Sequence, residues 1–281
     1  MLDPPYTFDA PDADLILRAP LQPGSEEFKD FHTHKAVLSI ASTLFRDMFS
    51  IPQPPQPADG DTTPPVVQVV EPAELFETFL RLIYPIEPPA VDSLQLVDDL
   101  FQLAEKYMAN RVYAMLKHTL SSPSFLRDDP IWVYAIACRA NLNEEAELAI
   151  RHTFQIDLVQ EIPHKHLQML TAEAYNCLLI SHASRRGEIV SALDRAKSQP
   201  TKPAGKCNCG SWFYTRLCKD IKLAIWKGNP FLDRRRLDSC LSDFKGGMPR
   251  SECGLGSSCR VSAEATAEYF TDILNEIGKL G

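Results

Sequence analysis

Four cysteines near the carboxyl end of the chain are its strongest candidates for chemistry. One residue separates Cys207 from Cys209, and five residues separate Cys253 from Cys259. Each pair lies in a glycine-containing turn before a predicted helix, so antiparallel packing of these helices would bring the four thiols together. Four thiolates suit the tetrahedral coordination of Zn²⁺, although structural zinc sites more often use other spacings. A zinc site, free thiols and a disulfide all stay open.

The cellular compartment bears on the state of these cysteines. The first residues, Met1–Pro5, carry neither a run of positive charge nor an apolar stretch, so they do not resemble a secretory leader. We therefore expect an intracellular protein, cytoplasmic, nuclear or both. In a reducing compartment, cysteines are thiols or metal ligands more often than disulfides. No motif requires a cofactor, and zinc is the one candidate.

No pattern of a catalytic site or of a phosphate-binding loop occurs in the chain. The G-x-G-x-x-G, P-loop, G-x-S-x-G and H-E-x-x-H patterns are all missing from the sequence, and we predict a protein without enzymatic activity. Residues 1–110 carry 6 Lys and Arg against 18 Asp and Glu, which argues against binding of nucleic acid there. No apolar run approaches the roughly 18 residues of a membrane span, so we expect no membrane partner.

Length and composition predict about two domains. The chain has 281 residues, of which 44% are hydrophobic and 23% charged, as in ordinary globular proteins. Residues 1–12 are rich in Pro and Asp, and we expect them to be flexible. The stretch 52–65 holds six of the 22 prolines and has the composition of a solvated loop.

The first half of the chain mixes strand and helix patterns. Strands are predicted over 14–19, 28–32 and 66–70, the first two as a hairpin around the Pro23–Gly24 turn. Apolar residues at helical spacing predict helices between 36 and 120, and Ser42 and Ser93 are suited to cap two of them. The sequence therefore predicts an α+β domain over 13–121.

Only helical patterns follow residue 130. They define one region over 130–196, which includes helices at 144–154, 164–170 and 172–182. A linker of the composition Gln-Pro-Thr-Lys-Pro-Ala-Gly occupies 199–205. It leads to a cysteine-containing, helical carboxyl-terminal region over 206–281. The chain is thus expected to be an α+β domain with an all-α extension.

A series of motifs in the first half resembles the BTB/POZ family. The motifs are Asp14-Leu15-Ile16-Leu17, Phe31-x-x-His34-Lys35-Ala36-Val37-Leu38, Ser42-x-x-Phe45-Arg46-x-Met48-Phe49, Val67-Gln68-Val69, Phe79-Leu80-x-x-Ile83-Tyr84 and Leu103-Ala104-Glu105-Lys106-Tyr107. They cover about residues 8–121 in order. The resemblance implies the BTB/POZ fold, a short mixed sheet with helical hairpins. Residues 130–182 resemble the BACK-like helical pairs of BTB adaptors, and the tail is similar to that of small BTB proteins of filamentous and mushroom-forming fungi.

The resemblance implies a function in protein–protein interaction. BTB proteins serve as adaptors of cullin-type ubiquitin ligases or as homotypic assembly modules, so the implied partner is a cullin scaffold or another BTB chain. The implied partner surface comprises Phe45, Met48, Phe49, Ile51, Tyr107 and Leu116. Where cullin adaptors often carry an apolar-x-Glu motif, this chain has Ile51-Pro52-Gln53.

The sequence leaves open the oligomeric state of the protein and two alternatives to the adaptor function. The resemblance places Asp14 and Lys35 at the strand–helix junction as a charged pair, for which a structural salt bridge is the expectation. The protein is a monomer or a dimer. A zinc-stabilised helical binding module, with the BTB domain as an oligomerisation handle, and a transcription-linked nuclear BTB factor are the alternatives to the adaptor.

Overall fold

A computed structural model describes residues 6–52, 63–154, 156, 158 and 164–198 of the chain. The chain divides into two compact units. The first consists of residues 1–129 and 136–145, and the second of residues 130–135 and 146–281. Each unit is described by itself.

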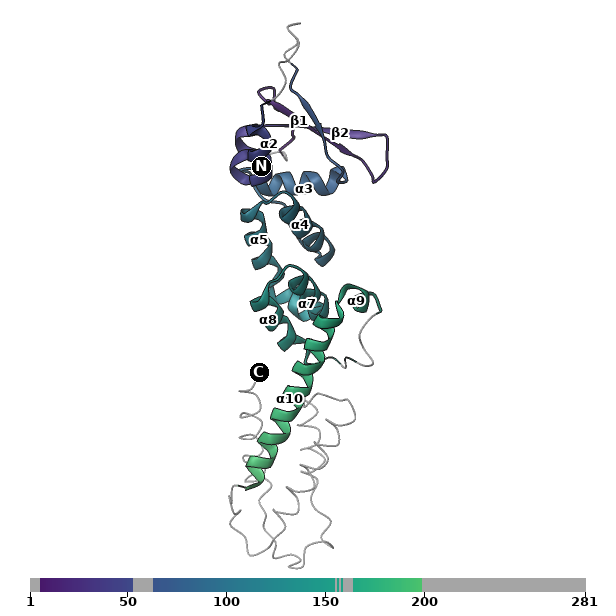
Figure 1. The fold of residues 1–281 in the computed structure, drawn as a ribbon, viewed down its shortest axis with the longest axis vertical. Helices are drawn as coiled ribbons and strands as arrows, with labels where there is room; N and C mark the ends of the chain where they lie inside the picture. Colours follow the sequence, from purple (N-terminus) through teal and green to yellow (C-terminus); the bar gives the residue numbers. More distant parts are fainter. Residues whose placement is uncertain (1–5, 53–62, 155, 157, 159–163, 199–281) are drawn as a thin grey trace, which may run out of the picture. The chain divides into compact units, whose positions relative to one another are not determined.

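A three-stranded mixed sheet forms one layer of the first unit (Figure 1). Strand β1 (Leu15–Pro20) lies between β2 (Phe28–Thr33), to which it is antiparallel, and β3 (Val66–Gln68), to which it is parallel. The β1–β2 register joins Leu15 to Thr33 and Pro20 to Phe28, which confirms the predicted hairpin. Gly24 has a φ of +78° in its turn, a conformation that costs glycine little.

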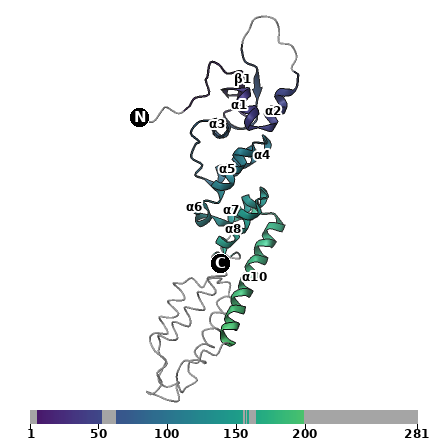
Figure 2. The ribbon, with the colours of Figure 1, turned by 90° about the vertical axis from the view of Figure 1, so that its left-hand side faces the viewer.

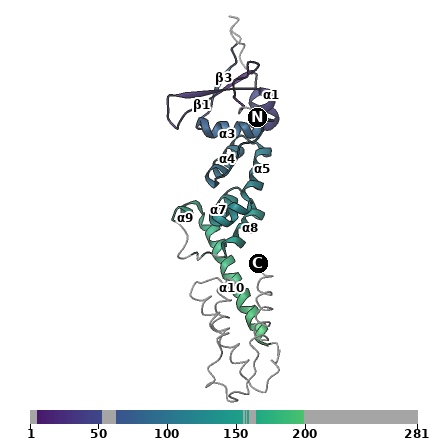
Figure 3. The ribbon, with the colours of Figure 1, turned by 180° about the vertical axis from the view of Figure 1, so that it is seen from behind.

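Six helices accompany the sheet among the described residues of the first unit up to residue 129. They are α1 (Lys35–Ala41), α2 (Thr43–Ser50), α3 (Ala73–Ile83), α4 (Leu94–Lys106), α5 (Asn110–Leu120) and α6 (Pro123–Asp128). Helix α3 lies along the β1–β2 hairpin in Figures 1 and 3. Helices α1 and α2 form one neighbouring pair (Figure 2), and α4 and α5 form another. The α+β class, a short mixed sheet with helical hairpins, is confirmed.

Aromatic side chains fill the core between the sheet and the helices. Phe31 from β2 contacts Phe76 from α3 with ring centroids 5.9 Å apart. Tyr107, which follows α4, lies 5.8 Å from Phe76, 5.3 Å from Phe79 and 5.2 Å from Phe45. All five rings are buried, and aromatic contacts of this kind add to the stability that burial of apolar area provides.

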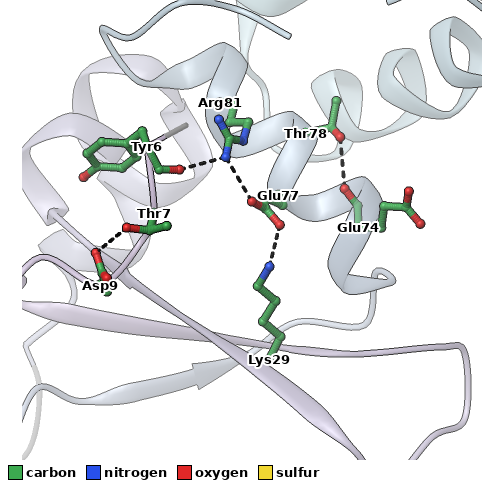
Figure 4. Close-up of polar contacts among 8 residues, drawn as sticks. All are labelled: Tyr6, Thr7, Asp9, Lys29, Glu74, Glu77, Thr78 and Arg81. Carbon is green, nitrogen blue, oxygen red and sulfur yellow. Dashed lines mark hydrogen bonds and ion pairs between the residues drawn. The ribbon is translucent and has the colours of Figure 1, made fainter. Parts of the chain in front are cut away.

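The segment that precedes β1 packs on the sheet and on α3. Phe8 is buried between Phe31 and Tyr84, and its carbonyl accepts a 2.9 Å hydrogen bond from the backbone of His32. In Figure 4, Arg81 reaches from α3 to the carbonyl of Tyr6 at 2.7 Å. The Pro and Asp content of residues 1–12 did not indicate these contacts of Tyr6 and Phe8, and the flexibility expected of this stretch stays a prediction.

One ion pair ties α3 to the sheet beside that segment, and a second one lies within α3. Lys29 of β2 lies 2.6 Å from Glu77, and Arg81 lies 3.2 Å from the other oxygen of the same carboxylate (Figure 4). Burial alone would raise the pKa of Glu77, but hydrogen bonds from Lys29 and Arg81 hold it below its ordinary value.

Helices continue beyond residue 129, as the sequence predicts. They are α7 (Pro130–Arg139), α8 (Asn143–Thr153), α9 (His164–Met169) and α10 (Ala172–Ser198). Within the second unit, Tyr134 donates to the carbonyl of Ala174 at 2.8 Å. Helix α10 extends well past the predicted end at residue 182. In the described part of the chain, no helix combines the length and the apolar character needed to cross a membrane.

Candidate interaction surface

Ser42 fixes the start of α2 against the end of α4. Its hydroxyl accepts a 3.1 Å hydrogen bond from the backbone of Phe45 and donates to the carbonyl of Tyr107. One side chain thus satisfies an orphan N–H of the helix, as predicted for a cap, and also a carbonyl of another helix. Because Ser42 is buried, both bonds are shielded from water.

Three of the six predicted partner-binding residues lie in the core. Phe45, Tyr107 and Leu116 are 2%, 4% and 0% exposed. Their assignment to an accessible partner surface is therefore wrong. Phe45 and Tyr107 stack with ring centroids 5.2 Å apart, and Leu116 is on the inward face of α5 with Val112 and Leu120. These three residues contribute to packing rather than to contact with a partner.

The other three predicted residues lie partly or largely at the surface. Met48 and Phe49 are half-buried, with Phe49 stacked on Phe45 at 5.9 Å. Ile51, directly after α2, is 60% exposed. Leu44 is 37% exposed, and its spacing of i, i+4 and i+7 with Met48 and Ile51 places the three on one side of the helix.

Met108, from another part of the chain, approaches the start of α2 through its backbone. Its carbonyl lies 3.5 Å from the backbone nitrogen of Thr43 at the start of α2, and its side chain is 53% exposed. We call Leu44, Met48, Ile51 and Met108 the α2 surface. Sequence reasoning missed Leu44 and Met108 as surface residues, because an apolar pattern at helical spacing does not tell which of its side chains are exposed.

The backbone of Met108 is in the left-handed region, with φ of 50°. This residue follows the cap of α4, where glycine is the usual choice, and a residue with a Cβ pays a conformational penalty there. The turn is held by hydrogen bonds from Met108 to Glu105 at 3.1 Å and from Ala109 to Ala104 at 2.8 Å. Strained residues often occur at functional positions, and methionine adapts well to a partner surface.

Glu71 stabilises the same turn through hydrogen bonds with the two residues that precede Met108. Its carboxylate accepts hydrogen bonds from Lys106, from the Tyr107 hydroxyl at 2.8 Å and from the backbone of Val70 at 3.2 Å. Burial alone would raise the pKa of Glu71, but the bonds from Lys106 and Tyr107 hold it below its ordinary value. Burial strongly raises the pKa of Tyr107, and the charge of Glu71 adds to this effect. The network therefore requires an ionised Glu71 and a protonated Tyr107.

Asp14 and Lys35 meet, but not as a salt bridge. The Asp14 carboxylate accepts a 2.7 Å hydrogen bond from the backbone N–H of Lys35 at the start of α1. Within the described residues, no ion pair joins the two side chains. The cap residue of α1, His34, makes no side-chain cap bond, so Asp14, directly before β1, takes over this function.

His34 lies instead between Tyr84 and Asp12. The Tyr84 hydroxyl accepts a 2.8 Å hydrogen bond from the His34 backbone, and the His34 ring lies 3.4 Å from Asp12. Burial raises the pKa of Tyr84 to about 12. This junction is structural, because it connects β2, α1 and the end of α3.

The predicted zinc ligands Cys207, Cys209, Cys253 and Cys259 lie outside the described residues. In the part of the chain that the structure describes, no group of three or more His, Cys, Asp or Glu side chains is arranged to hold a metal ion. The zinc site therefore stays a prediction.

Comparison with known protein families decides what this fold is. Residues 25–124 match the BTB/POZ domain family. This segment is a BTB/POZ domain. A search of curated proteins found no match to the chain. The α2 surface lies entirely within the matched residues, whereas β1 precedes them and completes the sheet. A BTB/POZ domain indicates a general role in protein–protein interaction.

Proposed function

We propose that the chain is a non-enzymatic adaptor whose BTB/POZ domain binds a protein partner through the α2 surface. The observation that carries the proposal is the exposure of Leu44 and Ile51 on one side of α2 with the half-buried Met48 between them, together with the exposure of Met108, whose backbone contacts the start of that helix. Apolar side chains that gather on a folded surface mark interaction sites more often than isolated ones do. A partner that covers them would remove apolar area from water on both sides.

The proposed partner is a cullin scaffold, and a second copy of a BTB chain is the alternative. Ile51 supports the first, because it occupies the apolar position of the motif that cullin adaptors carry after the second helix. The acidic residue of that motif is replaced by Gln53. The apolar contact would therefore have to supply most of the affinity in this chain.

A pull-down of the purified full chain with a purified cullin scaffold tests the proposal. Met48→Asp and Ile51→Asp place a charge in the α2 surface, and we expect either to lower retention at least tenfold. Ile180→Asp on α10 is the matched control, since Ile180 is 56% exposed and lies in the second unit. No retention of the wild-type chain would eliminate the cullin scaffold as the partner.

The mass of the same sample in solution tests the alternative. If a second BTB chain is the partner, the wild-type chain has twice the monomer mass and Ile51→Asp has the monomer mass. A monomeric wild-type chain that does not bind the cullin scaffold would overturn both forms of the proposal.

A further inference from the structure

Asp98 occupies a position of α4 at which the helical pattern calls for an apolar residue. It lies on the inward face of the helix, between Leu94, Val97 and Phe101, and is 4% exposed. Burial of a carboxylate is costly unless a cation and hydrogen bonds compensate for it. The position of Asp98 therefore requires a specific partner.

Arg139, at the end of α7, is that partner. Its two terminal nitrogens bind the two oxygens of Asp98, one of them at 2.9 Å. This fork-to-fork geometry fixes orientation as well as charge. Burial lowers the pKa of Arg139, although its side chain remains 44% exposed.

Two residues of α5 hold the same segment. The hydroxyl of Tyr113 donates to the carbonyl of Ala140. Lys117 lies 3.3 Å from Glu145 and 3.4 Å from Glu144, at the start of α8. Hydrogen bonds with Glu145 and Glu144 raise the pKa of Lys117. The α4–α5 pair thus contacts one short stretch of chain with the carboxylate of Asp98, the hydroxyl of Tyr113 and the ammonium group of Lys117.

We infer that residues 136–145 form an intramolecular latch, which occupies the α4–α5 face of the BTB/POZ domain and withholds it from protein partners. All the contacts named lie within the first unit. A competing partner must bring a guanidinium to Asp98 and a carboxylate to Lys117, as the latch does. This surface is distinct from the α2 surface, so the inference does not depend on the proposed adaptor function.

The buried ion pair determines which segment the α4–α5 face accepts. An apolar residue in place of a buried ion pair is often equally or more stabilising, and the ion pair supplies specificity instead. Ile136 and Leu142 are buried as well, so the latch is closed in the free protein. Opening it removes the cation from Asp98, and a partner with a matching guanidinium would replace that cation.

A labelled synthetic peptide with the sequence of residues 134–148 tests the inference on the full chain. In the wild type the face is occupied, so the peptide binds weakly. In Arg139→Ala the peptide supplies the missing guanidinium, and fluorescence anisotropy is expected to show at least tenfold tighter binding. The double variant with Asp98→Ala and Arg139→Ala removes the anion, and is expected to lose this gain.

Hydrogen exchange on the same variants shows whether the latch opens alone. Faster exchange in 136–145 and in α4–α5, with unchanged exchange in β1, supports the latch. Lys117→Ala keeps the buried pair and is expected to give a smaller gain in peptide affinity, about twofold to fivefold. Equal peptide affinity for all variants, or faster exchange throughout the sheet in both Arg139→Ala and Lys117→Ala, would overturn the inference.

Discussion

Single residues of the BTB/POZ domain differ in whether they stabilise the fold or are suited to contact a partner. Met108 has a left-handed backbone and an exposed apolar side chain, and neither property benefits an isolated domain. Glu71 is the opposite case, since a buried carboxylate makes three hydrogen bonds, two of which join the connection between β3 and α3 to the end of α4. The first residue is expected to serve a partner and the second to serve the fold.

Met108→Gly is expected to stabilise the domain by about 0.5–1 kcal/mol, because glycine adopts a positive φ without the Cβ penalty. Chemical denaturation measures the change in the free energy of unfolding. Asn141→Gly is the matched control, since Asn141 has φ of 54° and asparagine tolerates this region well, so its effect should be smaller. A destabilised Met108→Gly variant would show that the side chain contributes more to the fold than its strain costs.

Glu71→Gln is expected to cost about 1–2 kcal/mol at pH 7, because it removes charge from hydrogen bonds to a buried carboxylate. The folded pKa of Glu71 lies below its unfolded value. Its contribution is therefore complete above the unfolded pKa of about 4.3 and is lost as the pH falls through the folded pKa.

Denaturation of both forms at several pH values checks this sign. The difference between wild type and Glu71→Gln should be largest near neutral pH and shrink below about pH 4. Glu74→Gln, at an exposed position of α3, is the control and should match the wild type. A difference that grows on acidification would contradict the assignment of an ionised Glu71.

Elements of the BTB/POZ domain are joined at their ends as much as along their faces. Ser42 links α2 to the end of α4, and Asp14 links β1 to the start of α1. Ser93 also caps its helix, accepting from Leu96 at 3.2 Å, but it is exposed. The two serine caps therefore allow a comparison of a cap that connects helices with one that does not.

Ser42→Ala is expected to cost about 2 kcal/mol and Ser93→Ala about 1 kcal/mol. The larger effect follows because Ser42→Ala also leaves the buried carbonyl of Tyr107 without its donor. Thermal or chemical unfolding of the two variants gives the comparison. Equal costs would mean that the link between α2 and α4 adds nothing to the cap.

The sequence predicts those elements that depend on residues close together along the chain. Periodicity and caps predicted the β1–β2 hairpin, both serine caps and the helices from α1 to α5, because these depend on neighbours along the chain. The same periodicity could not tell that Phe45, Tyr107 and Leu116 face inward, since an apolar stripe does not state what covers it. Asp98 was missed for a related reason, because its cation lies 41 residues away.

On the scale of the whole molecule, the first unit includes residues 136–145 in addition to residues up to 129. A domain that ends at residue 121, as the sequence alone predicts, would leave Asp98 without Arg139. We expect a truncated chain of residues 1–148 to unfold at a higher temperature than a truncated chain of residues 1–121. Identical melting temperatures would show that the contact with the extension contributes nothing to stability.

The carboxyl-terminal cysteines bear on the stability of the full chain. If Cys207, Cys209, Cys253 and Cys259 hold zinc, elemental analysis of the full chain gives about one zinc per molecule, and a chelator lowers its stability cooperatively. Protein purified under reducing conditions that contains no zinc would remove the metal-stabilised module and leave the adaptor function untouched.

We propose that the BTB/POZ domain binds its partner through the α2 surface. Titration of the purified full chain with the cullin scaffold decides this for the wild type, Ile51→Asp and Ile180→Asp. We expect saturable binding by the wild type, and at least a tenfold loss of affinity for Ile51→Asp with no loss for Ile180→Asp. Equal affinity of all three proteins would exclude the α2 surface as the binding site.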